Sequence, residues 1–276
     1  MQDFNLQYWQ ENTTSFLDME KPLDFRFELP RPPGGPLVEV SSLEMEKFLL
    51  KRLEAAGDDP VQALWQLARF YKQTGQLEKS LVRLRQLLEW LSGPEDRARC
   101  FLNMGQTMEQ AHRFAIAAGY YKQALALEPM HTSTWYFVNN NLGFCLIAMD
   151  RFAEAEVYCR KAIETDPNRP NAYKNLGTAL SSQGQYRDAA QCFIAATQVN
   201  AADNRAFLLL RDLLRDHPEL VFEFETAAAC CEKAVEAAAQ KLKEMQPTVH
   251  RGWRKHLILF SAKVRALFRH LWNGSF

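Results

Sequence analysis

The chain contains two copies of one short pattern, Asn141-Leu142-Gly143-Phe144-Cys145-Leu146 and Asn175-Leu176-Gly177-Thr178-Ala179-Leu180. The copies lie 34 residues apart, and the same interval separates Ala155 from Ala189. A fixed period of about 34 residues is typical of an array of helix–turn–helix units, each of which buries its apolar face against the next unit. The period therefore predicts a fold made of stacked helix pairs.

Two earlier copies of the pattern precede these, in residues 64–77 and 101–129. Small Gly and Ala positions in each copy allow two helices to approach closely, and the large apolar positions fill the remaining space. The interval between equivalent positions is longer here, 37 residues from Leu67 to Met104 and 38 residues from Met104 to Leu142. We expect the extra residues to lie in turns at 95–97 and 132–135.

The repeated residues resemble the tetratricopeptide repeat family over residues 61–201. The resemblance implies an all-α fold, a right-handed α-solenoid of helix–turn–helix units with extra capping helices at the N-terminal and C-terminal ends. Ser41 followed by Glu44 predicts a capping box at the start of the first helix. The predicted parts are an irregular, acidic and aromatic arm that ends in a Pro/Gly-rich breaker (1–36), an N-terminal helix (37–59), an array of about four repeats (60–201), a degenerate fifth repeat or cap (202–246) and a basic amphipathic C-terminal helix (247–276).

The resemblance also implies a binding groove, because in this family the first helix of each pair lines a concave surface. The residue before each Leu-Gly, or its equivalent, points into that groove, and these residues are Gln66, Asn103, Asn141 and Asn175. They are similar to the Asn ladder of the O-GlcNAc transferase superhelix, whose amides bind the backbone of an extended peptide. A side-chain amide has two donors and an acceptor, which match a peptide group. The other groove candidates are Trp65, Arg69, Arg99, Gln106, Phe137, Asn140, Phe144, Asn171, Lys174 and Thr178.

The groove candidates favour a protein or peptide partner, in an extended conformation. Arg69, Arg99 and Lys174 suit an acidic side chain or a C-terminal carboxylate, and the aromatic candidates suit apolar side chains. The full Lys/Asn/Asn/Lys/Arg set of carboxylate-clamp co-chaperones is not reproduced, so binding to chaperone tails is not expected. Two alternatives stay open: the amides bond only to neighbouring groups of the chain, or the acidic N-terminal arm occupies the groove as an internal ligand.

The C-terminal segment carries a helical stripe of apolar residues flanked by basic ones. The stripe consists of Trp253, Leu257, Phe260, Val264, Leu267 and Leu271. Such a helix can seal the last repeat of a solenoid, or attach to an anionic membrane or a partner groove. Nucleic acid is not expected, because the rest of the surface is not basic.

Charge distribution, cysteine content and the lack of long apolar segments indicate where the protein is located. The formal net charge is zero, but residues 1–59 contain 6 Lys/Arg against 12 Asp/Glu, and residues 241–276 contain 8 against 1. The six cysteines are expected to be reduced and mostly buried. The first residues lack a basic start and an apolar stretch, so a secretory signal is not expected, and no apolar run approaches the roughly 20 residues that span a bilayer. We therefore expect a cytoplasmic protein.

Residue patterns for catalysis are not found in the sequence. The six histidines lack metal-ligand spacing, and neither a Gly-x-Ser-x-Gly motif nor a phosphate-binding Gly-rich loop is present. We therefore expect a non-enzymatic protein with no catalytic residue, metal, cofactor or small-molecule substrate. The predicted function is a scaffold or adaptor that binds an extended peptide segment in the groove. The alternatives are a peripheral membrane-associated assembly factor attached through its basic C-terminal helix, and a self-associating array.

Overall fold

A computed structural model of the chain describes residues 27–28 and 39–244. These residues fall into two compact units, which divide after Gly184. The described part is helical apart from a two-residue antiparallel strand pair, in which β1 (Phe27–Glu28) pairs with β2 (Glu39–Val40). The prediction of an all-α repeat fold is confirmed, although the segment expected to be irregular contributes β1.

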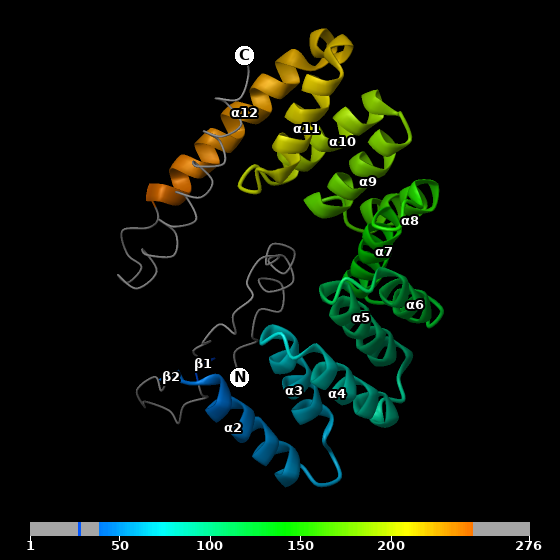
Figure 1. Cartoon of the computed structure of the whole chain (residues 1–276), viewed down its shortest axis with the longest axis vertical. Helices are drawn as coiled ribbons and strands as arrows, with labels where there is room; N and C mark the ends of the chain where they lie inside the picture. Colours follow the sequence, from blue (N-terminus) through cyan, green and yellow to red (C-terminus); the bar gives the residue numbers. More distant parts are fainter. Residues whose placement is uncertain (1–26, 29–38, 245–276) are drawn as a thin grey trace. The chain divides into compact units, whose positions relative to one another are not determined.

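The first unit consists of α2 (Ser42–Ala55) followed by consecutive helices of similar length (Figure 1). These are α3 (Val61–Gln73), α4 (Leu77–Trp90), α5 (Pro94–Gln110), α6 (Phe114–Leu125), α7 (Thr132–Ile147), α8 (Phe152–Thr165) and α9 (Pro170–Ser182). Each helix packs against the next one along the chain. The predicted capping box begins α2, because the Ser41 hydroxyl accepts from the Glu44 N–H while a Glu44 carboxylate oxygen accepts from the Ser41 N–H.

The turn inside each repeat has the same backbone conformation. The residue two positions before each second helix has a positive φ, and these residues are Gly75 (φ 74), His112 (φ 55), Asp150 (φ 58) and Gly184 (φ 78). In three of these turns the following residue donates its N–H five residues back to the end of the first helix: Gln76 to Tyr71 (2.8 Å), Arg113 to Met108 (2.8 Å) and Arg151 to Leu146 (2.9 Å). Glycine adopts this left-handed conformation without steric cost, so His112 and Asp150 hold it under mild strain. The repeat is therefore encoded in the backbone as well as in the apolar pattern.

The prediction that the extra residues of the longer repeats lie in turns is wrong. α5 and α7 have 17 and 16 residues, whereas α3 and α9 have 13 each, and the extra residues form the first turns of α5 and α7. Pro94 is favourable at the first position of α5, and acidic residues behind it stabilise the helix N-terminus. The N-terminal extensions also join α5 to α7, because the Glu95 carboxylate accepts from the Thr134 hydroxyl (2.6 Å) and from the His131 N–H (3.1 Å).

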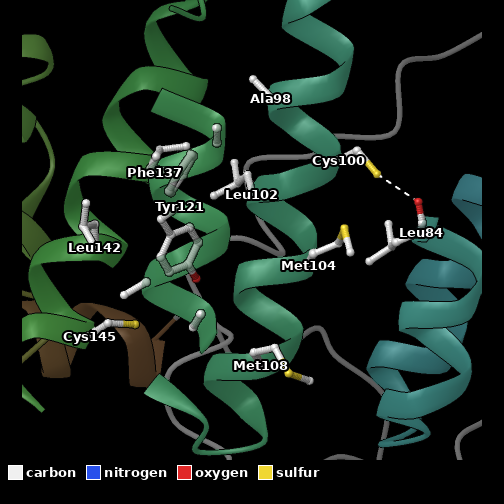
Figure 2. Packing of buried hydrophobic residues seen from close by; sticks show 14 of the residues in the cluster. Leu84, Ala98, Cys100, Leu102, Met104, Met108, Tyr121, Phe137, Leu142 and Cys145 are labelled. Atoms are coloured by element: carbon white, nitrogen blue, oxygen red, sulfur yellow. Dashed lines mark hydrogen bonds between the residues drawn. The ribbon is translucent and has the colours of Figure 1, made fainter. Parts of the chain in front are cut away.

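Close approach of helices depends on the small residues of the pattern. A Cβ on Gly105 would overlap the buried ring of Tyr121, and a Cβ on Gly143 would lie 2.6 Å from Cys159 Sγ. Around Tyr121, the side chains of α5, α6 and α7 form one apolar core, and Cys100 Sγ donates to the Leu84 carbonyl oxygen at 3.3 Å (Figure 2). The glycines therefore set the distance between the two helices of a repeat, as the sequence predicts.

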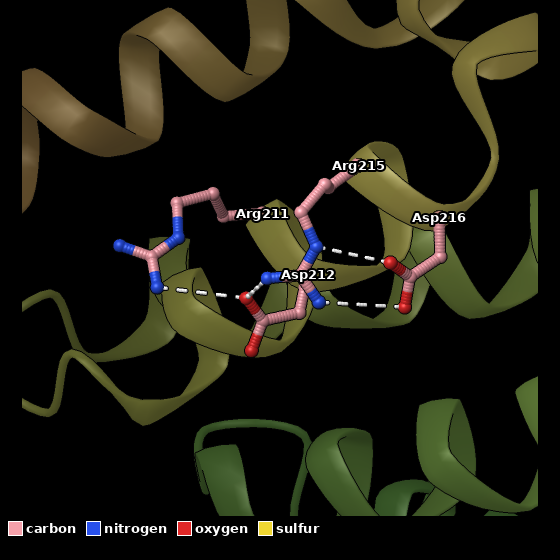
Figure 3. Close-up of polar contacts among 4 residues, drawn as sticks. All are labelled: Arg211, Asp212, Arg215 and Asp216. Carbon is pink, nitrogen blue, oxygen red and sulfur yellow. Dashed lines mark hydrogen bonds and ion pairs between the residues drawn. The ribbon is translucent and has the colours of Figure 1, made fainter. Parts of the chain in front are cut away.

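The second unit contains α10 (Tyr186–Val199), α11 (Arg205–Asp216), a short 3-10 turn (Pro218–Leu220) and α12 (Val221–Glu244). α10 contacts α11 and α12, and α11 contacts α12. Leu210, Phe224 and Cys231 are buried in this unit. On the surface of α11, charged residues pair with one another along the helix (Figure 3).

Candidate functional site

The first helices of successive repeats form a continuous layer in the first unit. α5 contacts α7 directly, and α7 contacts α9, in addition to the contacts of each helix with its sequence neighbours. Hydrogen bonds between polar side chains join α3 to α5 and α7 to α9 within this layer. We call the surface carried by α3, α5, α7 and α9 the first-helix face.

Lys72 joins α3 to α5. Its ammonium donates to Asn103 Oδ1 (3.2 Å) and to Gln106 Oε1 (2.8 Å). Asn103 also donates through Nδ2 to the Arg99 carbonyl oxygen (2.9 Å), one turn earlier in its own helix. An ammonium has three donors, so these two bonds leave Lys72 one further donor.

A second set of polar groups links α5, α6, α7 and α9. Asn175 Nδ2 donates to Asn140 Oδ1 (3.1 Å), and Asn140 Nδ2 donates to Asn141 Oδ1 (3.0 Å). Asn141 Nδ2 lies 3.5 Å from the Tyr121 hydroxyl, which donates to Glu109 Oε2 (2.7 Å). We call these side chains, together with Lys72, Asn103 and Gln106, the polar ladder.

The two ionisable ends of the polar ladder are electrostatically perturbed. Burial lowers the pKa of Lys72 to about 8, with a further lowering from the nearby Arg69 charge, and Glu109 opposes this shift. Burial raises the pKa of Glu109 to about 7, against the hydrogen bond from Tyr121 and the charge of Lys72. Perturbed pKa values of this kind are more frequent at functional sites, although structural networks also produce them.

Most of the predicted groove residues retain partly exposed side chains. Arg99 is exposed and forms an ion pair with Asp96 (3.4 Å). Three of the predicted residues have little exposed surface, namely Phe137 (6%), Asn140 (7%) and Lys174 (7%). The Arg169 guanidinium lies 4.8 Å from the centre of the Phe137 ring, so this ring packs inside the protein. The half-buried candidates are Trp65, Gln66, Arg69, Asn103, Gln106, Asn141, Phe144, Asn171, Asn175 and Thr178.

Several predicted amides already bond to groups of the chain. Asn175 donates to Asn140, and Asn140 donates to Asn141. Asn103 accepts from Lys72 and donates to the Arg99 carbonyl oxygen, and Thr178 donates to the Lys174 carbonyl oxygen (2.9 Å). The Gln66 side-chain oxygen is buried and accepts no hydrogen bond in the described part of the chain. The amides therefore hold one another in place and keep part of their bonding capacity, since each primary amide offers two donors and two acceptor lone pairs.

Three members of the polar ladder were not singled out from the sequence: Lys72, Glu109 and Tyr121. The repeat itself carried a signal, because Lys72 and Glu109 lie 37 residues apart and so occupy the same position of successive repeats. Each also lies one helical turn after a predicted groove residue, Arg69 and Gln106 respectively. Tyr121 takes the position of a large apolar residue, and its hydroxyl role depends on the helix packing.

Comparison with known proteins agrees with this architecture. A family description, "Tetratricopeptide repeat", matches residues 59–128 and 136–201. The chain is a tetratricopeptide repeat protein. The repeat fold supports a role as a protein–protein interaction scaffold, and members of this family are typically non-enzymatic.

Known tetratricopeptide proteins resemble the chain at low identity. "Tetratricopeptide repeat-containing protein trd-1" of Caenorhabditis elegans is 24% identical over 42% of this chain and 18% of its own length. "DnaJ homolog subfamily C member 3" of Mus musculus is 24% identical over 56% of this chain and 33% of its own length. The chain thus spans a third or less of these two relatives.

Solved structures support the fold. BtubC from P. vanneervenii superposes with a TM-score of 0.56 at 18% identity, covering 76% of this chain and 92% of its own. YrrB, described as a "TPR protein with an unusual peptide-binding site", superposes with a TM-score of 0.51 at 20% identity, covering 72% and 99%. At this identity the likeness shows the fold alone.

Other predicted features fall partly outside the described residues. The basic C-terminal helix (247–276) lies outside them, as does the N-terminal arm (1–36) except for β1. All six cysteines are free thiols, and four of them, Cys100, Cys145, Cys159 and Cys231, are buried. Among residues 27–28 and 39–244, no group of three or more His, Cys, Asp or Glu side chains is placed to hold a metal ion. The helices described between Ser42 and Glu244 are all too short or too polar to cross a membrane.

Proposed function

We propose that the protein binds an extended segment of a partner protein along the first-helix face of its first unit. The observation that carries this proposal is the polar ladder, in which Asn103 of α5, Asn141 of α7 and Asn175 of α9 occupy equivalent positions of successive repeats and Lys72 of α3 bonds to Asn103. A regular row of amides suits a partner whose own donors and acceptors also repeat, and an extended peptide backbone has this property.

Pre-organisation of the polar ladder favours binding. The amides are held by hydrogen bonds to one another, so a ligand would not have to order them, and the side-chain entropy cost of binding is reduced. Asn141 and Asn175 are half-buried, and each uses only part of its bonding capacity. In this arrangement the two amides bind main-chain groups, and the half-buried Trp65 and Phe144 contact apolar side chains of the partner.

The sign of the charge on the first-helix face favours an acidic partner. The four first helices contain five basic residues, Arg69, Lys72, Arg97, Arg99 and Lys174, against three acidic ones, Glu95, Asp96 and Glu109, all on α5. The partner segment is therefore expected to carry Asp or Glu among apolar residues.

The test uses the full chain and a displayed library of random peptides. Selected peptides are synthesised with a fluorescent label, and their affinity is measured by fluorescence anisotropy for the wild type and for the Asn141→Ala/Asn175→Ala double variant. We expect the double variant to bind at least tenfold more weakly, with unchanged helix content by circular dichroism. A matched control, Gln123→Ala/Gln191→Ala, removes two exposed amides from second helices and should bind like the wild type.

Backbone recognition is tested on the peptide side. Methylation of single peptide nitrogens removes one main-chain donor at a time and leaves the side chains unchanged. We expect affinity to fall at several alternate positions of a selected peptide. Equal affinity of wild type and double variant, or selected peptides that tolerate methylation everywhere, would overturn the proposal.

A further inference from the structure

We propose that residues 1–20 bind the first-helix face of their own chain and compete there with partner peptides. The inference rests on the proposed function, because it assigns an internal ligand to the same surface. It follows from three features of the chain: where the N-terminal arm is attached, what residues 1–20 contain, and which charges the first-helix face carries.

The described residues connect the base of the arm to α2, which packs against α3. β1 pairs with β2 in a register that places Phe27 opposite Val40, directly before the capping residue Ser41 of α2. α2 in turn bonds to α3, because the Tyr71 hydroxyl donates to Glu46 Oε1 at 2.9 Å. Tyr71 precedes Lys72 in the chain, so residue 27 is tied to the helix that begins the polar ladder.

The residues before β1 are numerous enough to extend along the first-helix face. Residues 21–26 span at most about 20 Å when extended, and residues 1–20 span about 65 Å. Packed helices lie about 8–10 Å apart, so the distance from α3 across α5 and α7 to α9 is on the order of 30 Å. Residues 1–20 are thus long enough to cross all four first helices.

The composition of residues 1–20 matches the ligand expected for this surface. The segment contains Asp3, Glu11, Asp18 and Glu20 and no Lys or Arg, together with the aromatic residues Phe4, Tyr8, Trp9 and Phe16. On the first-helix face, Arg69 and Lys72 of α3 provide positive charge, and the acidic residues of this face are confined to α5. Of these, Asp96 is paired with Arg99, and burial holds the pKa of Glu109 at about 7.

Covalent attachment strengthens a weak contact of this kind. A ligand on a short tether has an effective concentration in the millimolar range, so an intrinsic affinity in that range or better gives substantial occupancy. A partner peptide must then displace the arm, and its apparent affinity falls in proportion to the fraction of open sites. The arm would therefore set a threshold for partner binding.

The experiment compares full-length chains that differ only in the charge of the arm. An arm-neutral variant carries Asp3→Asn, Glu11→Gln, Asp18→Asn and Glu20→Gln. The probe is a fluorescent synthetic peptide of residues 1–20, and its affinity for each chain is measured by anisotropy. We expect the arm-neutral variant to bind the probe at least tenfold more tightly than the wild type, because its own arm no longer competes.

A matched control neutralises four exposed carboxylates elsewhere, with Glu164, Glu225, Glu232 and Glu236 changed to Gln. This control should bind the probe as weakly as the wild type. The location is tested by adding Lys72→Met to the arm-neutral variant, which should weaken probe binding. Lys122→Met, at an exposed position of α6, should leave probe binding unchanged.

The outcomes separate this inference from the proposed function. A probe that binds neither chain, or binds the wild type and the arm-neutral variant equally, would overturn the internal-ligand proposal. In that case, library peptides that still depend on Asn141 and Asn175 would leave the proposed function intact. The opposite result has two parts. Library peptides would bind the wild type and the Asn141→Ala/Asn175→Ala variant equally, whereas the probe would bind the arm-neutral variant tightly and lose this binding with Lys72→Met. The proposed function would then fail, and the first-helix face would be a site specific for the arm.

Discussion

The polar side chains in the C-terminal half of α5 and those of α11 are arranged in opposite ways. In α11, Arg211, Asp212, Arg215 and Asp216 pair within one helix, and each side chain is at least 46% exposed (Figure 3). In α5, Asn103 and Gln106 bond to Lys72 of α3, and Glu109 bonds to Tyr121 of α6, in partly buried surroundings. Exposed pairs within a helix are solvated and screened, whereas bonds between helices depend on how the helices are placed. The comparison indicates that only the second arrangement couples stability to the placement of neighbouring helices.

The largest expected effect comes from separating the helices that carry the polar ladder. In Gly105→Ala, the new methyl group overlaps the buried Tyr121 ring and must push α5 and α6 apart. We expect the free energy of unfolding to fall by about 3 kcal/mol, the upper range for overpacking a core. Chemical denaturation followed by circular dichroism measures this change.

Gly119→Ala is the matched control for this substitution. Gly119 lies in the interior of α6, and a Cβ there would meet no atom within 4 Å. Alanine is favoured over glycine in a helix by about 1 kcal/mol, so this variant should be as stable as the wild type or more so. Destabilisation by both substitutions would show that the close approach at Gly105 is not the cause.

Glu109 should make the stability of the first unit depend on pH. Its folded-state pKa is raised to about 7 from the usual 4.5, so the folded state holds the proton more tightly than the unfolded state. Stability from this group is therefore complete below about pH 4.5 and is lost as the pH rises to 7 and above. In Glu109→Gln this loss is absent, and the variant should gain on the order of 2 kcal/mol relative to the wild type between pH 5 and 7.5.

The pH series needs a carboxylate that lacks this environment. Glu225→Gln, at an exposed position of α12, should leave the pH profile of the wild type unchanged. If the unfolding free energies of the wild type and Glu109→Gln change with pH in parallel from pH 5 to 7.5, the raised pKa of Glu109 is contradicted.

Tyr121→Phe removes the hydroxyl that links Glu109 to Asn141 and keeps the ring that packs against Gly105. Glu109 then loses its donor, and its pKa should rise further because the charged form has lost a hydrogen bond. We expect a loss of about 1 kcal/mol in unfolding free energy, since protonation of Glu109 limits the cost of the missing bond. A stability loss at pH 7.5 no larger than that at pH 5 would show that the hydroxyl does not support a charged Glu109.

The sequence was sufficient to predict the repeat architecture, because its signal is local and periodic. Leu142-Gly143 and Leu176-Gly177 mark equivalent positions, and the close approach at Gly105 and Gly143 follows from their lack of a side chain. Pattern reasoning also named the amides Asn103, Asn141 and Asn175, and the structure places all three in the polar ladder.

The remaining features depend on distances that a repeat does not specify. Residues 95–97 and 132–135 extend α5 and α7, since helix-compatible residues after Pro94 and His131 prolong the helix as readily as they lengthen a turn. The Lys72–Asn103 bond crosses from one repeat to the next, and the Tyr121 hydroxyl reaches Glu109 only because α5 and α6 pack closely at Gly105. Periodicity identifies equivalent positions, but it does not show which neighbouring side chains meet.

The smallest effect is expected for the exposed ion pairs of α11. Asp212→Asn removes the carboxylate that pairs with Arg211 and Arg215. Arg215 keeps its ion pair with Asp216 (3.0 Å), and water solvates the exposed guanidinium of Arg211, so no buried charge loses its partner. The melting temperature, measured by differential scanning fluorimetry at low and at physiological salt, should match that of the wild type within error. A clear drop at both salt concentrations would mean that the exposed pairs of α11 contribute as the polar ladder does, and the distinction between pairs within a helix and bonds between helices would not hold for this protein.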